Sequence, residues 1–200
     1  MRKIPTLFIK QFDADGKYIG LSHEITPGCE VVFEHRTIPT LKVDGAACMI
    51  KDMVLYKRYD AKKGKPIPKN AIPCQDAPDE ITGHFPHWVP VNPNDNADRW
   101  FIEAYRNYSH TYRDLPLYNF NGTFEAVGKH FNGNPYNSEI DTLYRHGSKI
   151  ITDIDTNYTY ESIRDYLSDH YIEGIVFWFR NEPLCKIRRI DFGFEWNKRK

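Results

Sequence analysis

At 200 residues, with 40% hydrophobic and 14% aromatic side chains, the chain can form one domain with a packed core. Its 27 basic residues balance 27 acidic ones, which excludes the overall positive charge typical of a strong duplex binder. It has no apolar run of signal-peptide or membrane-span length, and its four cysteines form no C-x-x-C pair. We therefore expect free thiols, a cytoplasmic location (the host cytoplasm for a viral chain), no membrane contact and a monomer.

Short apolar segments bounded by turn residues predict several strands. They are expected at residues 6–12, 46–50, 53–59, 123–127, 171–179 and 184–190, with turns at 13–16, 51–52 and 180–183. Apolar residues recur at helical spacing from Ala97 to Tyr108, and Thr159 is a suitable N-cap for a second helix that runs to His170. Short strands with two or three helices predict an α+β domain.

Residues 60–95 differ from the rest of the chain because they are rich in Lys, Pro, Asn and Asp and lack an apolar period. This composition predicts a long ordered loop or insertion within a single domain that covers residues 1–200. Cys74, His84 and His87 lie in this segment, but they lack the paired spacing of a structural zinc site.

Lys42-Val43-Asp44-Gly45 is the segment that most directly indicates chemistry. In an extended backbone the Lys42 amine and the Asp44 carboxylate point to the same side, and Gly45 permits close approach of backbone or ligand. A lysine attacks only as the free amine, which is scarce at neutral pH because its ordinary pKa is about 10.4. A nucleophilic Lys42 therefore requires nearby positive charge. The alternative is a solvated Lys–Asp pair at the end of a strand.

Two later segments favour the nucleophile. Glu173 precedes Gly174 at the start of an apolar strand. Lys186 and Arg188 alternate on one face of the next strand, where both can reach one phosphate chain. Glu125 is the acidic residue of an otherwise apolar strand, and carboxylate oxygens such as these suit Mg²⁺.

Together these segments resemble the motifs of the covalent nucleotidyltransferase superfamily, and the chain looks like an ATP-dependent RNA ligase of the small RNA ligase 1 type. The matching segments are K-x-D-G at residues 42–45, the third motif at 123–128 with a glycine-asparagine-proline turn at 132–136, E-G-x-V at 173–176, and K-x-R at 186–188. The family has K-x-K at the last position, so Arg188 keeps the charge but changes the geometry. The resemblance runs from about residue 30 to about residue 195.

The resemblance implies two antiparallel sheets with the nucleotide pocket between them. It implies that Lys42 takes AMP from ATP, that AMP passes to an RNA 5′-phosphate, and that an RNA 3′-hydroxyl then seals the strand, with Lys186 and Arg188 also catalytic. Nucleotide binding is implied for Leu41, Asp44, Gly45, Arg58, Glu125, Glu173 and Lys186, and Mg²⁺ or Mn²⁺ binding for Asp44, Glu125 and Glu173. Lys57 with Arg58 is expected near ribose or phosphate, Phe124 or Phe177 on adenine, and accessory RNA-repair proteins are compatible partners.

Three alternatives share part of this pattern. Capping-type guanylyltransferases and DNA ligases usually extend the motif to K-x-D-G-x-R, whereas position 47 is Ala. They also carry an oligonucleotide-binding domain after the last motif, and only eight residues follow Phe192, so we expect no such domain. A non-catalytic nucleotide- or RNA-binding module is the third alternative, although binding alone would not require Lys42, Glu173 and Lys186 together.

Overall fold

The computed structural model describes residues 2–62, 64–80, 82–116 and 120–197, which group into two compact units. Among the described residues, unit 1 holds 2–3 and 44–146, and unit 2 holds 4–43 and 147–197. Within the described ranges the chain passes from one unit to the other after Lys3, after Val43 and after His146. The K-x-D-G segment therefore contributes Lys42 to unit 2 and Asp44 to unit 1.

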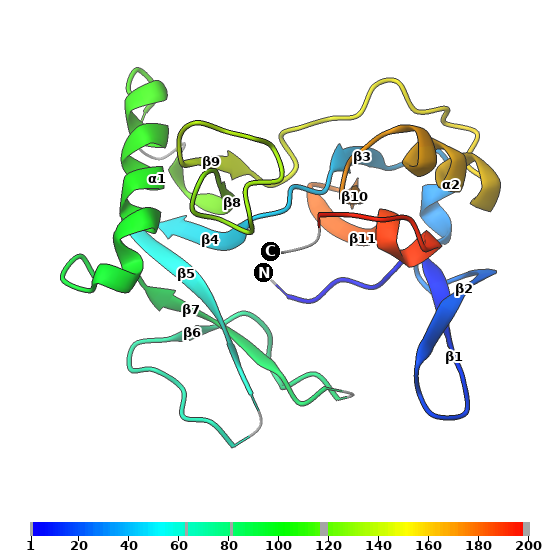
Figure 1. Cartoon of the computed structure of the whole chain (residues 1–200), viewed down its shortest axis with the longest axis horizontal. Coiled ribbons are helices and arrows are strands. Elements are labelled where there is room, and N and C mark those ends of the chain that lie inside the picture. The colour runs from blue at the N-terminus through cyan, green and yellow to red at the C-terminus, as the bar shows by residue number, and fades with distance from the viewer. Residues whose placement is uncertain (1, 63, 81, 117–119, 198–200) are drawn as a thin grey trace. The chain divides into compact units, whose positions relative to one another are not determined.

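Unit 1 is built on a six-stranded antiparallel sheet in the order β6-β7-β5-β4-β8-β9 (Figure 1). Its strands are β4 (Ala46–Lys51), β5 (Val54–Ala61), β6 (Ile72–Pro73), β7 (Phe85–Pro90), β8 (Gly122–Val127) and β9 (Thr142–Arg145). The 3-10 helix η2 (Asn96–Asp98) leads into α1 (Arg99–Thr111), which matches the predicted helix with shifted ends. Side chains from α1, β4, β8 and β9 form the core of this unit.

Strand β7 lies within residues 60–95, where the sequence predicted a long ordered loop or insertion, so the loop alternative does not hold for this part. The strand pairs with β5 over its full length. The sequence did not predict this strand because it contains two prolines, and proline lacks the N–H that a strand donates. The Pro86 carbonyl accepts from the Cys74 N–H, so the backbone polar groups of Pro86 face β6 and not β5. Pro90 lies an even number of residues further along the strand, so its backbone faces the same side as that of Pro86. The missing N–H groups therefore leave the β5–β7 ladder intact.

Unit 2 contains the two-stranded sheet of β1 (Phe8–Phe12) and β2 (Tyr18–Ile25), and a sheet of β3 (Ile38–Leu41), β10 (Gly174–Phe179) and β11 (Glu182–Arg188) in the order β11-β10-β3 (Figure 1). The 3-10 helices η1 (Glu30–Val32) and η4 (Arg189–Phe192) and the helix α2 (Tyr160–Asp169) complete it. Thr159 caps α2 as predicted, because its Oγ1 accepts from the Ser162 N–H at 3.0 Å. Ile163 and Leu167 of α2 are fully buried in the core of this unit.

Both predicted β-hairpins are present, with shifted ends. Asp52 and Met53, with φ of 50° and 64°, join β4 to β5 one residue later than predicted. Arg180 and Asn181, with φ of 51° and 65°, join β10 to β11. Positive φ at both central residues suits the twist of paired strands, and it lets β11 begin at Glu182, earlier than expected.

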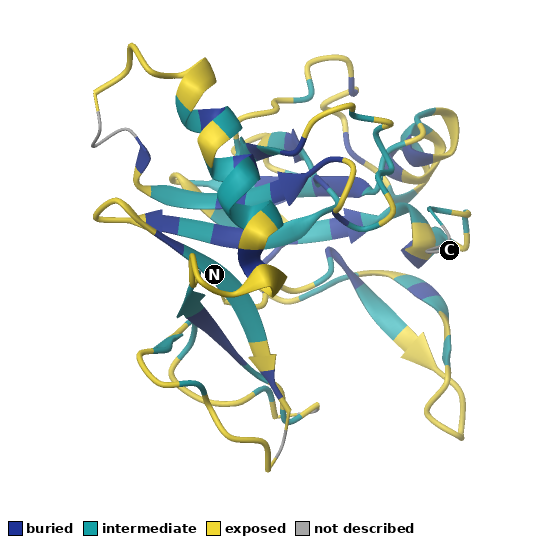
Figure 2. Cartoon of the chain, turned by 60° about the vertical axis from the view of Figure 1, so that its left-hand side comes forward, coloured by how far each residue is buried: buried dark blue, intermediate teal, exposed yellow. Residues whose placement is uncertain are grey.

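The described residues form a mixed α/β structure of mostly sheet with few helices, as the sequence predicted, and this content is compatible with a nucleotidyltransferase-like domain. Strands β2, β3 and β9 were not predicted, because they are short or interrupted by polar residues and Pro39. Exposed residues concentrate in the long connections, whereas the strands alternate buried and partly exposed positions (Figure 2). Within the described ranges, each helix is too short or too polar to cross a bilayer.

Candidate functional site

The face of the β11-β10-β3 sheet opposite the core of unit 2 carries the predicted cations. Cys185 and Ile187 of β11 are fully buried in the core, so strand alternation directs Lys186 and Arg188 to the other face. Gly174 lies directly opposite Arg188 in the register. A Cβ at Gly174 would lie 2.2 Å from the Ile187 carbonyl oxygen. The glycine therefore allows β10 and β11 to approach each other closely.

Lys42 lies one residue beyond the end of β3, where its backbone N–H donates to the Gly174 carbonyl. This bond brings its side chain to Glu173, and the Lys42 Nζ to Glu173 Oε1 distance is 2.5 Å. The two side chains retain only 23% and 12% of their exposure. The amine is thus held by a carboxylate in a sheltered position. Leu41, at the end of β3, pairs with Ile175 of β10.

The ammonium of Lys186 is surrounded by charges of its own sign. Burial, the charge of Lys42 and the charges of Arg188 and Lys10 lower its pKa to about 8, and Asp191 opposes them. Among the residues that the structure describes, no carboxylate lies within 4.0 Å of the Lys186 nitrogen. A partly buried cation without a close counter-charge favours an anionic ligand.

Asp191 holds Arg188 in place. The Arg188 Nε and Nη2 atoms donate to its two carboxylate oxygens at 3.1 and 2.7 Å, and the Arg188 backbone N–H also donates to it. Such a bidentate pair fixes the guanidinium plane. Asp191 itself is 2% exposed, and its backbone carbonyl accepts from the Tyr18 hydroxyl at 2.5 Å.

In unit 1, Glu125 lies on the face of the six-stranded sheet that is opposite the core. Its neighbours Phe124 and Ala126 are fully buried, and Ala47 and Tyr144 are its partners on the flanking strands. Its Oε2 atom lies 2.9 Å from His146 Nε2, and both side chains are 13% exposed.

Gly45 packs against β8 beside Glu125. A Cβ at Gly45 would lie 2.2 Å from the Ala126 carbonyl oxygen and 2.9 Å from the Glu125 Cγ. The residue type at position 45 is therefore explained by close packing of the backbone against β8, and a ligand is not needed to account for it.

The loop between β8 and β9 fastens Asp44 and Gly45. The Asp44 N–H donates to the Tyr136 hydroxyl at 2.6 Å, and Asn132 Nδ2 donates to Asp44 Oδ1 at 2.9 Å and to the Gly45 carbonyl. Asn132 has φ of 45°, a left-handed conformation that asparagine tolerates. Asp44 is therefore oriented by a segment that is remote in sequence.

Arg58 and Lys57 point to opposite faces of β5. Cys48 pairs with Lys57, so by alternation Arg58 shares the outer face with Ala47 and Glu125, and its Nε donates to Asp60. Lys57 forms an ion pair with Asp98, which is 1% exposed at the start of α1. This ion pair places the Lys57 ammonium on the core face of β5, away from the face that carries Arg58, and its expected place near ribose or phosphate stays a prediction.

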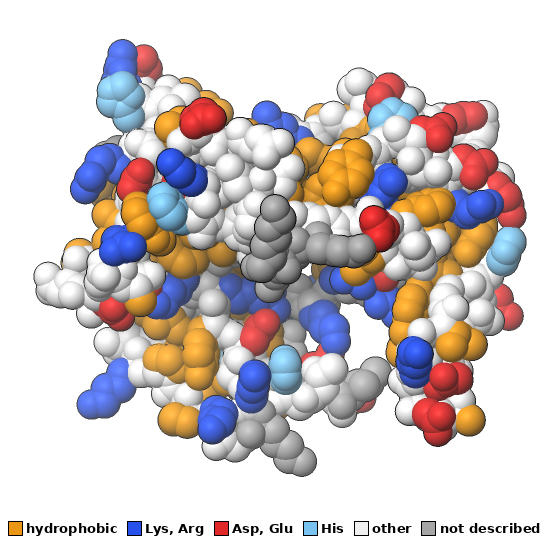
Figure 3. All heavy atoms as spheres, viewed as in Figure 1, with side chains coloured by type: hydrophobic (Ala, Val, Ile, Leu, Met, Phe, Trp, Pro, Cys, Tyr) orange, Lys and Arg blue, Asp and Glu red, His pale blue; other side chains and the backbone are white. Residues whose placement is uncertain are grey.

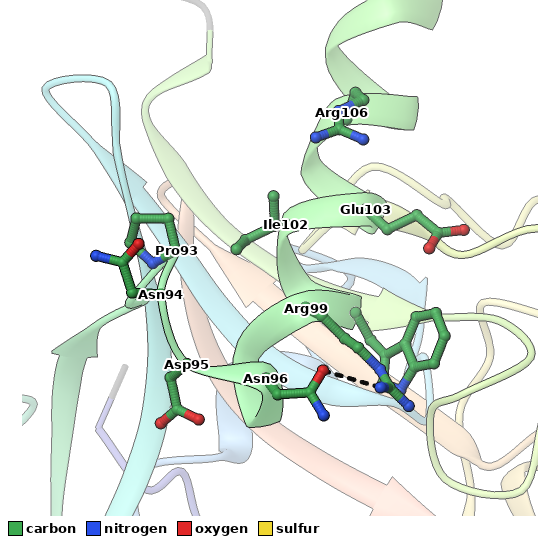
Figure 4. Close-up of a pocket in the computed structure, with 9 residues that line it drawn as sticks. Pro93, Asn94, Asp95, Asn96, Arg99, Ile102, Glu103 and Arg106 are labelled. Atoms are coloured by element: carbon green, nitrogen blue, oxygen red, sulfur yellow. Dashed lines mark hydrogen bonds between the residues drawn. The ribbon is translucent and has the colours of Figure 1, made fainter.

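The expected adenine-stacking residues lie elsewhere. Phe124 and Phe177 are both 0% exposed, so their rings belong to the cores of unit 1 and unit 2. Adenine stacking was therefore wrong for Phe124, and for Phe177 the alternative of a core residue is confirmed, because a fully buried ring has no face to offer a ligand. Unit 1 also has a pocket of about 460 Å³ at the start of α1, which contains none of the predicted site residues (Figure 4). It is lined by residues 93–96, 99, 100, 102, 103 and 106.

No group of three or more His, Cys, Asp or Glu side chains in the described part of the chain has a geometry that could hold a metal ion. The predicted ligands Asp44 and Glu125 belong to unit 1 and Glu173 to unit 2. Their oxygen atoms fit Mg²⁺ chemically, since Mg²⁺ keeps several waters and needs only one or two carboxylates plus substrate phosphates. The magnesium site stays a prediction.

The structure thus brings Lys42, Glu173, Lys186 and Arg188 together in unit 2. In unit 1 it places Glu125 and Arg58 on one face of the sheet and packs Gly45 beside Glu125. The sequence singled out the turn at 132–136 but not the contacts of Asn132 and Tyr136 with Asp44, and it gave no sign that His146 and Asp191 orient Glu125 and Arg188. On the face shown in Figure 3, acidic and basic side chains are interspersed, in line with the zero net charge.

Comparison with known proteins gives a similarity to an RNA ligase. The chain is 26% identical to RNA ligase 1 of Pongo abelii, in an alignment of 227 positions that covers 81% of this chain and 69% of that protein. No protein-family model matches the chain.

Proposed function

We propose that this chain is an ATP-dependent RNA ligase that joins 5′-phosphate and 3′-hydroxyl RNA ends through a lysyl-AMP intermediate. The observation that carries the proposal is the Lys42–Glu173 pair beside Lys186 and Arg188 in unit 2. A sheltered amine among phosphate-binding cations suits nucleotidyl transfer, and pure binding would not require the amine. The similarity to an RNA ligase 1 supports the choice of RNA as the substrate.

In the first step the Lys42 nitrogen attacks the α-phosphorus of ATP. An N–P bond forms, the bond from the α-phosphorus to the bridging oxygen breaks, pyrophosphate leaves with that electron pair, and one proton goes to solvent. Lys186 and Arg188 hold the phosphates, since they share one face of β11. Glu173 holds the amine in place before the nucleotide binds.

In the later steps AMP passes from Lys42 to the RNA 5′-phosphate, and the RNA 3′-hydroxyl displaces AMP. Asp44, Glu125 and Glu173 would hold the Mg²⁺, which when bound supplies positive charge that neutralises the phosphates. Arg58 lies on the same sheet face as Glu125, where its guanidinium suits a ribose or a phosphate.

The test is the intact mass of the purified chain after incubation with Mg²⁺ and either ATP or GTP. An AMP adduct that is absent in Lys42→Ala supports the proposal, and a GMP adduct supports a capping-type enzyme. The wild type, once labelled, is then offered 5′-phosphorylated RNA and the matching DNA. Preferential sealing of DNA, or a wild type that never acquires AMP, would overturn the proposal.

A further inference from the structure

The N-terminal hairpin contributes a cation to the site of unit 2 that the sequence motifs do not contain. Lys10 lies on β1, upstream of the segment that resembles the RNA ligases, and its Nζ lies 3.6 Å from Asp191 Oδ1. Its charge acts on the Lys186 ammonium together with those of Lys42 and Arg188. Four cations from three separate segments therefore gather in one region of unit 2.

Backbone hydrogen bonds fix the hairpin to β11 at the position of Lys186. The Lys186 N–H donates to the Pro5 carbonyl at 3.0 Å, and the Leu7 N–H donates to the Lys186 carbonyl at 2.8 Å. Strand β1 begins at the next residue, Phe8, which is buried in the core. The register of β1 with β2 shifts between Phe8 and Lys10. An irregularity of this kind re-aims a side chain, so Lys10 does not follow Phe8 into the core.

Among the described residues of this cluster, the positive charges outnumber the negative ones. Lys10, Lys42, Lys186 and Arg188 supply four positive charges, whereas Glu173 and Asp191 supply two negative ones. Both carboxylate oxygens of Asp191 already accept a hydrogen bond from the Arg188 guanidinium. The Lys10 side chain is 32% exposed. Lys10 is thus close enough to join the cluster and exposed enough to meet a ligand, which a purely structural ion pair does not require.

We propose that Lys10 forms, with Lys186 and Arg188, a subsite for the β- and γ-phosphates of ATP, which leave as pyrophosphate. This inference rests on the proposed function. The chemistry recognised is a polyanionic phosphate chain, and two sources supply phosphate to such an enzyme, the nucleotide and the RNA end. The nucleotide is the better match, because three cations on two different strands, β1 and β11, can contact two successive phosphate groups, whereas an RNA end offers a single terminal phosphate.

The test compares Lys10→Gln with Lys10→Arg and with Lys17→Gln, a matched control at an exposed lysine of the same hairpin. The forward reaction gives the KM for ATP in lysine labelling. The reverse reaction, in which inorganic pyrophosphate removes AMP from labelled protein, gives the KM for pyrophosphate. We expect Lys10→Gln to raise both about tenfold. Lys10→Arg stays within about threefold of the wild type and Lys17→Gln does not change.

Two further measurements separate the sources and the causes. Sealing of chemically adenylylated RNA bypasses pyrophosphate, so Lys10→Gln leaves it unchanged, and an equal loss there would overturn the proposal in favour of the RNA end. The rise in melting temperature caused by inorganic pyrophosphate is measured within each variant, so lower starting stability does not remove the readout. A normal pyrophosphate KM in Lys10→Gln refutes the subsite alone, whereas an unlabelled wild type refutes the proposed function.

Discussion

In unit 2 the site residues are mainly cations, and carboxylates pair with three of them: Glu173 with Lys42, and Asp191 with Arg188 and Lys10. In unit 1 the arrangement is reversed, because Asp44 and Glu125 are carboxylates that accept from an amide and a histidine. One unit therefore gathers positive charge, and the other holds oriented carboxylate oxygen atoms.

The K-x-D-G segment joins these two chemistries, since the division between the units falls between Val43 and Asp44. Lys42 follows β3 of one unit, and Gly45 leads into β4 of the other. Within our proposal, bond formation depends on Lys42 of unit 2, whereas unit 1 contributes Asp44 and Glu125 as two of the three metal ligands. Single substitutions on either side of this division test whether the two units have these separate roles.

The largest difference is expected between Lys42→Arg and Asp44→Asn. Lys42→Arg lowers labelling with AMP at least about 1,000-fold, because the guanidinium is not a nucleophile, yet it leaves sealing of chemically adenylylated RNA nearly intact. Asp44→Asn lowers both reactions about tenfold, since the carboxylate serves every step. Intact mass and RNA sealing assays measure the two. Equal losses in both reactions for Lys42→Arg would show that the division of labour is wrong.

A smaller effect of opposite sign on activity and stability is expected for Lys186→Met. Labelling falls about 100-fold because a phosphate-binding charge is lost. The melting temperature rises by about 2–5 °C, because a poorly compensated, partly buried charge is replaced by a side chain that packs well. Lys51→Met, at an exposed lysine of β4, is the control and changes neither quantity. A melting temperature that falls in Lys186→Met would mean that the ammonium is well paired in the folded state.

Much of unit 2 could be predicted from local patterns. Alternation along β11 placed Lys186 and Arg188 on one face, and the Thr159 cap fixed the start of α2. Lys10 could not be predicted, because its place depends on a register shift in the hairpin and on pairing of residues 5–7 with β11. Neither leaves a periodic signal in the sequence.

Unit 1 was less predictable because its site also depends on contacts between segments that are remote in the sequence. Glu125 and Gly45 stand out in the sequence, but the side chain that orients Asp44 is Asn132, which is 88 positions away. The pairing of Lys57 with Asp98 and the use of prolines in β7 also depend on tertiary contacts that override local propensity. The sequence alone could not tell a core phenylalanine from one that stacks on a base, and the burial of Phe124 and Phe177 shows that both are core residues.

A moderate effect is expected for Asn132→Ala in unit 1. The Asp44 carboxylate and the Gly45 carbonyl lose a shared donor, so the KM for ATP rises about tenfold while labelling at saturating ATP changes less than threefold. Glu139→Ala, at an exposed position of the same loop, is the matched control. If Asn132→Ala instead lowered only the rate at saturating ATP, Asn132 would act in the bond-making step, and that step would not depend on unit 2 alone.

The smallest effect is a pH dependence that belongs to unit 2 alone. The pKa of Lys186 is lowered to about 8 from its ordinary 10.5, so its ammonium is lost between pH 7 and pH 9 in the ligand-free protein. The KM for ATP is then expected to rise about three- to fivefold over that range, and Lys186→Arg removes the dependence because arginine stays charged.

Stability responds to the same titration in the opposite direction. Since the unfolded chain binds the Lys186 proton more tightly, this residue's contribution to stability increases from about pH 8 to about pH 10.5. Denaturant unfolding of the wild type and Lys186→Arg across this range isolates that contribution. If the KM for ATP rose equally in the wild type and in Lys186→Arg, the titrating group would be one other than Lys186. The pH dependence would then no longer distinguish unit 2 from unit 1.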